Sequence, residues 1–89
     1  MREYWNYIAV RGDVKADLDA NAMYRIVRYN LIRLRENHHL TQAQLAKAIG
    51  CSATTISHFE SGQRKPTLAR LVQLSFVFDC ALDEFFAKV

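Results

Sequence analysis

Residues 41–60 of this 89-residue chain have the sequence TQAQLAKAIGCSATTISHFE, and this stretch decides the fold. Thr41, with Gln44 three residues later, forms a capping box that satisfies free amide groups at the start of a helix. Gly50 suits the left-handed position that ends such a helix, and Ser52 can cap the next one. The stretch therefore predicts two short helices, over 42–49 and 53–60, joined by a turn of three residues.

Two helices joined by so short a turn must pack closely, and the sequence supplies suitable side chains. Ala46 offers the small side chain that a steep crossing requires. A shared wedge of core can be built from four apolar residues of the two helices, namely Leu45, Ile49, Ile56 and Phe59. The outward face of the second helix then stays free, which is how a helix is presented to the major groove of DNA.

Apolar spacing on either side of this pair predicts three more helices. In the first, from about residue 21 to 38, one side is apolar and the other is basic: Met23, Val27, Leu31 and Leu34 against Arg25, Arg28 and Arg33. Thr67 can cap a fourth helix, with an inward stripe expected to comprise Leu68, Leu71, Val72, Ser75 and Phe76. A fifth is predicted over 82–88. Five helices with no evident need for a sheet predict an all-α bundle.

The pattern from Leu31 to Phe86 resembles the lambda-repressor-like helix-turn-helix family, of the Cro and cI or XRE type. The resemblance is carried by Leu31-x-x-Leu34-Arg35, Leu40-Thr41-Gln42-x-x-Leu45-Ala46, Gly50-x-Ser52-x-x-x-Ile56-Ser57, Glu60-x-Gly62-x-x-x-Pro66 and Leu82-Asp83-Glu84-Phe85-Phe86. It implies that residues 21–89 form a five-helix DNA-binding bundle. The implied function is a sequence-specific transcriptional regulator of double-stranded DNA, most simply a repressor that occludes a promoter.

The resemblance also implies roles for individual residues. Those expected to face base edges are Ala53, Thr54, Ser57 and His58, for which the alternative is plain helix surface. Those expected to contact phosphate are Gln42, Ser52, Thr55, Gln63, Arg64 and Lys65. Arg35 and Glu60 match the family's partly buried ion pair. Because the expected base-contacting side chains include no bidentate Arg or Gln, the operator sequence does not follow from them.

The charge of the chain is concentrated in its middle. The total is only +3, yet residues 20–78 hold eight basic and two acidic residues, a net charge of +6. Such an excess allows several cations to meet a phosphate backbone at once. The alternative is a set of solvated helix faces.

Other function classes find little support in the sequence. The spacing of the three histidines and two cysteines is not that of a zinc site, and no cofactor is expected. No nucleophile, base and orienting group occur in a recognisable arrangement, so we do not expect an enzyme. The chain contains no apolar run of about 18 residues and no signal peptide, which predicts a cytoplasmic protein without a membrane span.

Four positions depart from the family pattern. Cys51 and Cys80 stand where the family often has valine, so we expect small buried hydrophobic residues, with a redox switch as the alternative. Asp79 replaces the glycine that commonly ends the fourth helix. Ala81 replaces the Ser or Thr that commonly caps the fifth, which is therefore expected to start late or to depend on packing.

Residues 1–20 lie outside the resemblance and form an N-terminal arm. Within it, residues 4–10 (YWNYIAV) are aromatic and β-branched, which is typical of a strand, with a short helix as the alternative. We expect this segment to pack against its copy in a homodimer. Two alternatives stay open. The arm folds onto its own helices, or it binds another protein, as in an antitoxin or a protein-interaction module.

Overall fold

The computed structural model describes residues 16–88, and they are helical throughout their regular structure. The elements are α2 (Ala16–Asn37), α3 (Gln42–Ile49), α4 (Ala53–Ser61), α5 (Leu68–Val77) and the 3-10 helix η1 (Leu82–Phe86). No strand occurs in this part of the chain. The all-α prediction is confirmed, while the predicted strand over 4–10 lies outside the described residues.

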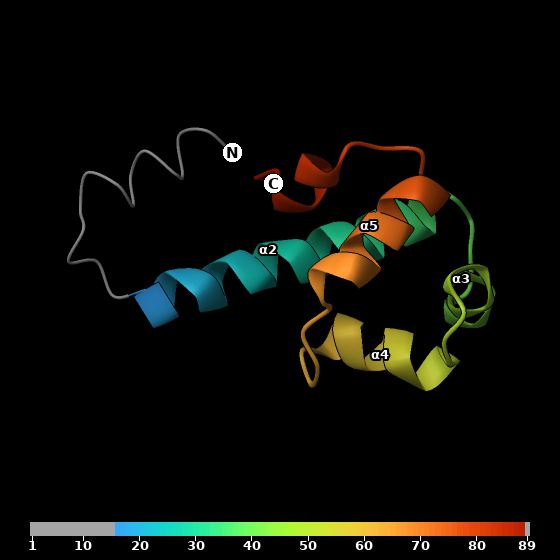
Figure 1. Cartoon of the computed structure of the whole chain (residues 1–89), viewed down its shortest axis with the longest axis horizontal. Coiled ribbons are helices and arrows are strands. Elements are labelled where there is room, and N and C mark those ends of the chain that lie inside the picture. The colour runs from blue at the N-terminus through green and yellow to red at the C-terminus, as the bar shows by residue number, and fades with distance from the viewer. Residues whose placement is uncertain (1–15, 89) are drawn as a thin grey trace.

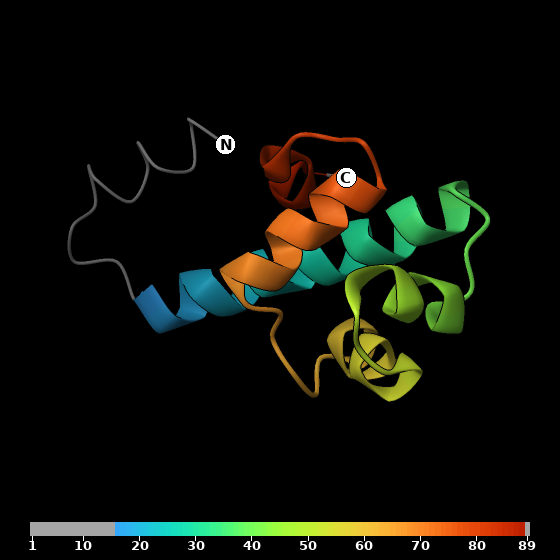
Figure 2. The same ribbon diagram turned by 45° about the vertical axis from the view of Figure 1, so that its right-hand side comes forward.

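Helix α2 spans the length of the bundle, and the other elements pack along it. Figures 1 and 2 show the α3–α4 pair below it and η1 above it, with α5 crossing it. It begins at Ala16, earlier than the predicted start near Asn21, and it runs unbroken through the expected boundary between residues 20 and 21. None of the helices in residues 16–88 has the length and apolar character needed to cross a membrane.

The core lies where the four α-helices and η1 meet. The predicted wedge between α3 and α4 is confirmed, because Leu45, Ile49, Ile56 and Phe59 are all at most 5% exposed. The rest of the core comes from Val27, Leu31, Leu34, Ala46, Leu71, Leu74, Phe78 and Phe85. Burial of one such large apolar side chain contributes about 1.5–3 kcal/mol, so this cluster holds the bundle together.

The inward stripe expected for α5 is wrong for three of its five residues. Leu68, Val72 and Phe76 are 65%, 37% and 79% exposed. The buried side of the helix instead consists of Leu71, Leu74, Ser75 and the C-cap residue Phe78. Because the sequence LARLVQLSFV is apolar on two sides, helical spacing fits either stripe, and only the packing against α3 and η1 decides between them.

The predicted helix caps are present. Thr41 Oγ1 accepts a hydrogen bond from the Gln44 N–H (3.0 Å), and Gln44 Oε1 accepts one from the Thr41 N–H (2.9 Å). Gly50 has φ +74° and ends α3 in the left-handed conformation. Ser52 and Thr67 each accept from the backbone N–H three residues on, which fixes the first residues of α4 and α5.

The C-terminal element differs from the predicted helix over 82–88. It is a 3-10 helix that ends at Phe86, and Ala81 provides no side-chain cap, as its methyl group dictates. Asp79 has φ +51°, a left-handed conformation that Asp tolerates better than most residues, at the position where the family has glycine. With no side-chain cap, this element depends on packing, which is confirmed by the full burial of Phe85.

Asn30 of α2 holds this terminal element in place. Its Nδ2 donates to the backbone oxygens of Phe85 (3.0 Å) and Ala87 (2.8 Å), while its Oδ1 accepts from the Arg33 guanidinium. Asn30 is fully buried, and a buried amide is tolerated when it is hydrogen-bonded in this way. No local pattern in the sequence points to this role of Asn30.

Candidate nucleic-acid interface

The turn between α3 and α4 holds the two helices close together. The Cys51 N–H donates to Ala46 O (2.9 Å), and the Ala46 side chain is 2% exposed, so the helices meet at this small residue. Ile56 and Phe59 point from α4 into the core. The opposite side of α4 therefore faces solvent, as the short turn and the apolar spacing predicted.

The four residues expected to face bases lie on this outer side of α4. Ala53 and Thr54 are exposed, whereas Ser57 and His58 are half-buried. Their spacing at i, i+1, i+4 and i+5 puts them on one helical face, away from the core. The structure therefore brings all four together on one surface.

The residues expected to touch phosphate lie in three places: the start of α4, the start of α3 and the loop after α4. At the start of α4, Ser52 is exposed and Thr55 is half-buried, and their hydroxyl oxygens lie 3.0 Å apart. Gln42 begins α3 at the positive end of its dipole, where an anion is favoured. Beyond the far end of α4, Gln63, Arg64 and Lys65 are all exposed.

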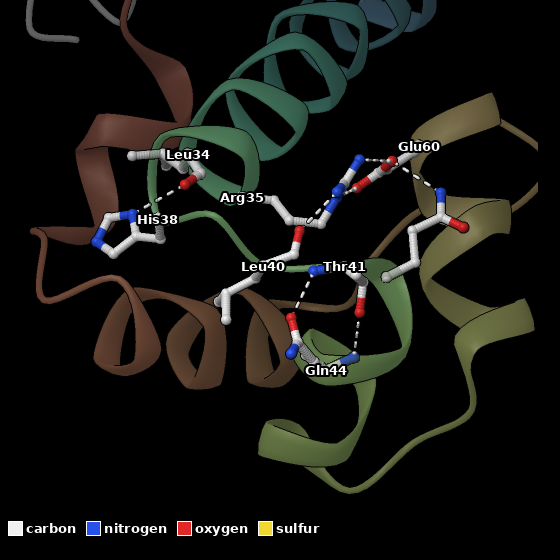
Figure 3. A network of polar contacts seen from close by, with 8 residues as sticks. Leu34, Arg35, His38, Leu40, Thr41, Gln44 and Glu60 are labelled. Atoms are coloured by element: carbon white, nitrogen blue, oxygen red, sulfur yellow. Dashed lines mark hydrogen bonds and ion pairs between the residues drawn. The ribbon is translucent and has the colours of Figure 1, made fainter.

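A network of charged and polar groups fixes the end of α4 against α2. Arg35 Nε donates to Glu60 Oε2 (2.6 Å) and Arg35 Nη2 to Glu60 Oε1 (3.1 Å), a bidentate pair, while Arg35 Nη1 donates to Leu40 O (2.8 Å) (Figure 3). The hydrogen bonds that Arg35 donates to Glu60 raise the pKa of Arg35 above its ordinary value. Gln42 Nε2 also donates to Glu60 Oε1 (2.9 Å). One carboxylate thus ties α2, α3 and α4 together.

Two arginines of α2 join the basic loop, which sequence reasoning missed. Arg28 Nη1 donates to Ser61 O (3.1 Å) at the end of α4, and Arg25 lines the same pocket of about 260 Å³. Arg64 and Lys65 line it from the loop. The sequence signal was the basic side of the first helix, but nothing in the sequence placed that side beside residues almost forty positions later.

The two cysteines are free and half-buried, and both pack against the hydrophobic core. Burial raises the pKa of the Cys80 thiol, with smaller contributions from the carboxylates of Glu84 and Asp79. A raised thiol pKa lowers the thiolate fraction and with it the reactivity. Packing against the core and a raised thiol pKa both favour a small hydrophobic role for Cys80 over a redox switch.

Residues 31–85 match the model of the helix-turn-helix family. The chain belongs to this family. The matched residues begin in the last third of α2 and end within η1, so they contain the whole α3–α4 unit and most of its supporting core. The first two thirds of α2 precede them. This helix-turn-helix chain thus carries an extension of α2 in front of the part that the family shares.

Known members of similar sequence are named as regulators. Over 58 residues the chain is 34% identical to the cryptic phage CTXphi transcriptional repressor RstR of Vibrio cholerae serotype O1, covering 65% of this chain and 52% of that protein. Over 53 residues it is 38% identical to the uncharacterized HTH-type transcriptional regulator YobD of Bacillus subtilis, covering 60% and 47%. The helix-turn-helix chain spans about half the length of these curated relatives.

A solved structure has the same arrangement of helices. The crystal structure of a transcriptional regulator from Listeria innocua matches with a TM-score of 0.63 and 30% sequence identity, over 71% of this chain and 59% of that one. The fold of the helix-turn-helix bundle is therefore shared with a protein of that name.

Proposed function

We propose that this protein is a sequence-specific regulator of transcription that binds double-stranded DNA in the cytoplasm, most simply as a repressor, without catalysis or a cofactor. The observation that carries the proposal is the outer face of α4. It is held away from the core by the α3–α4 turn and has exposed cations at its far end. This is the arrangement by which a recognition helix enters the major groove while flanking groups meet the backbone.

Within this proposal, the residues of the two groups have different tasks. Ala53, Thr54, Ser57 and His58 contact base edges, with methyl groups suited to thymine and a His58 ring nitrogen suited to a guanine acceptor. Backbone phosphates are met by Gln42, Ser52, Thr55, Gln63, Arg64 and Lys65. Arg35 and Glu60 position α4 and do not touch DNA.

We further propose that two copies bind one operator as a homodimer through residues 4–10. A pair of recognition helices about 34 Å apart would then reach successive major grooves on one side of the duplex. Removal of residues 1–15 should convert the dimer to a monomer in analytical ultracentrifugation, and an unchanged dimer would contradict this role of the arm.

The test of the function is selection of bound sequences from random duplex DNA. We expect enrichment of one sequence with two related half-sites, and binding that weakens steeply as salt rises. The alternative, a protein-interaction module such as an antitoxin, predicts no enriched sequence and a stoichiometric protein partner captured through residues 4–10. An enriched sequence therefore supports the DNA-binding regulator, and a protein partner without an enriched sequence supports the interaction module.

A further inference from the structure

Residues 21–28 of α2 and the loop after α4 line a pocket that lies partly outside the shared family domain. It has a volume of about 260 Å³, just below the roughly 300 Å³ at which pockets for drug-sized ligands begin. Its cations are Arg25 and Arg28 from α2 and Arg64 and Lys65 from the loop, with Asn21 and Tyr24 beside them. Such a size suits a small polar group better than a large organic ligand.

The pocket gathers four cationic side chains in one place. None of the described residues that line it is acidic. The cations are instead held by neutral groups: Lys65 Nζ lies 3.4 Å from Asn21 Oδ1 and 5.1 Å from the centre of the Tyr24 ring, and Arg28 donates to a backbone carbonyl. Because like charges brought together repel, an anion in the pocket would lower the electrostatic free energy of the site.

The backbone at Gly62 shows that the position of Arg28 depends on an absent side chain. Gly62 has φ +87°, and a Cβ atom built there would lie 2.2 Å from Arg28 Nη1. The Arg28 guanidinium therefore occupies space that any other residue at position 62 would fill. The left-handed turn and the missing Cβ together place a planar donor group at the wall of the pocket.

We propose that this pocket binds a phosphate group, with Arg25 and Lys65 as its main ligands and Arg28 and Arg64 completing the site. Guanidinium groups match phosphate oxygens with paired N–H donors, and Lys adds a mobile point charge. The phosphate is a phosphodiester of the duplex beyond the bases that α4 contacts, in which case the inference rests on the proposed function, or it is a free phosphate. The extension of α2 thereby adds a site for anions to the helix-turn-helix bundle.

The test uses the full chain, the variant Arg25→Gln and the charge-matched control Lys88→Gln, which changes an exposed residue outside the pocket. Each protein is titrated into duplexes with short and long flanks over a range of salt concentrations. It is also titrated with inorganic phosphate while the amide resonances of residues 62–65 are followed. For a phosphodiester source, Arg25→Gln reduces the slope of log affinity against log salt by about one on the long duplex only. If the site binds free phosphate, inorganic phosphate shifts these resonances in the wild-type protein and in Lys88→Gln but not in Arg25→Gln.

Either result supports the site and identifies where its phosphate comes from. The inference is overturned if Arg25→Gln matches wild type in the salt slope and phosphate shifts no resonance, and the proposed function stands if a DNA sequence is still selected. Conversely, if no sequence is selected while phosphate still shifts residues 62–65, the proposed function fails and the pocket remains.

Discussion

Arg35 in the last turn of α2 and Glu60 near the end of α4 meet at 2.6 Å, and their side chains are only 15% and 8% exposed. The pair is bidentate, and the same carboxylate accepts from Gln42. A carboxylate so placed keeps the last turn of α4 at a fixed distance from α2 and α3. The orientation of the outer face of α4 therefore depends on a contact made on its inner side.

Replacing Glu60 by Gln should destabilise the protein by about 3 kcal/mol, because it leaves the Arg35 charge partly buried without a counter-charge. The matched control is Glu84→Gln, which breaks an ion pair with Arg33 whose side chains are 31% and 44% exposed. That exposed pair is worth at most about 1 kcal/mol. Urea unfolding followed by circular dichroism measures both. Equal losses for the two variants would show that burial of the Arg35 pair adds nothing.

Asn30→Ala should loosen the C-terminal element while leaving the α3–α4 unit intact. The substitution leaves the buried backbone oxygen of Phe85 and the partly buried one of Ala87 without their donor, at a cost of about 1–3 kcal/mol. Amide hydrogen exchange should accelerate over residues 82–87 more than over 42–61. Asn30→Asp keeps the shape but removes the donor, so it should be at least as damaging. Full protection of 82–87 in both variants would rule out this anchoring role.

The two left-handed glycines offer a matched pair of substitutions. Gly50→Ala incurs only the strain of a positive φ, about 1–2 kcal/mol, since a Cβ there meets nothing within 4 Å. Gly62→Ala incurs the same strain and also displaces the Arg28 guanidinium. Because the displaced atoms end a flexible side chain, we expect similar losses of stability for the two variants in thermal unfolding, but weaker phosphate binding for Gly62→Ala alone. Identical behaviour of the two variants would mean that Arg28 moves aside without consequence.

The wedge of core and the caps followed from the sequence because each depends on residues within a few positions of one another. Thr41 with Gln44, and Gly50 with Ser52, specify the turn wherever the rest of the chain lies. The role of Asn30 did not follow, because its partner carbonyls lie more than fifty positions away. The buried side of α5 did not follow either, since its sequence is apolar on both candidate faces.

For the candidate interface, too, one part was predictable from the sequence and another was not. The outer face of α4 was predictable from the spacing of its buried residues, Ile56 and Phe59, which leaves one possible exposed side. The phosphate pocket was not, because Arg25 and Lys65 meet only when the first half of α2 packs beside the loop after α4. Charge counting located the excess in residues 20–78 but could not say which cations lie together.

Substitutions on and beside α4 should separate base contacts from backbone contacts. Thr54→Ala and His58→Ala remove groups on the outer face, so they should change which sequence is preferred. Arg64→Ala removes an exposed cation, so it should weaken binding to all duplexes alike and reduce the salt slope by about one. Fluorescence anisotropy with the selected sequence and with single-base variants of it measures both effects. The same loss on every sequence for all three variants would contradict the assigned recognition face.

Cys80 should react slowly with iodoacetamide near neutral pH. The reaction rate should keep rising as the pH passes 9.0, the ordinary pKa of a thiol. The thiolate is the reactive form, and burial of the thiol raises its pKa, so less thiolate is present at any given pH. The variant Cys51→Ser makes Cys80 the sole reporter, and the same protein in urea provides the control, because unfolding restores the ordinary pKa. The folded curve should lie at higher pH than the unfolded one. Coincident curves, or a folded rate that levels off below pH 9, would overturn this account and reopen a redox role for the cysteine.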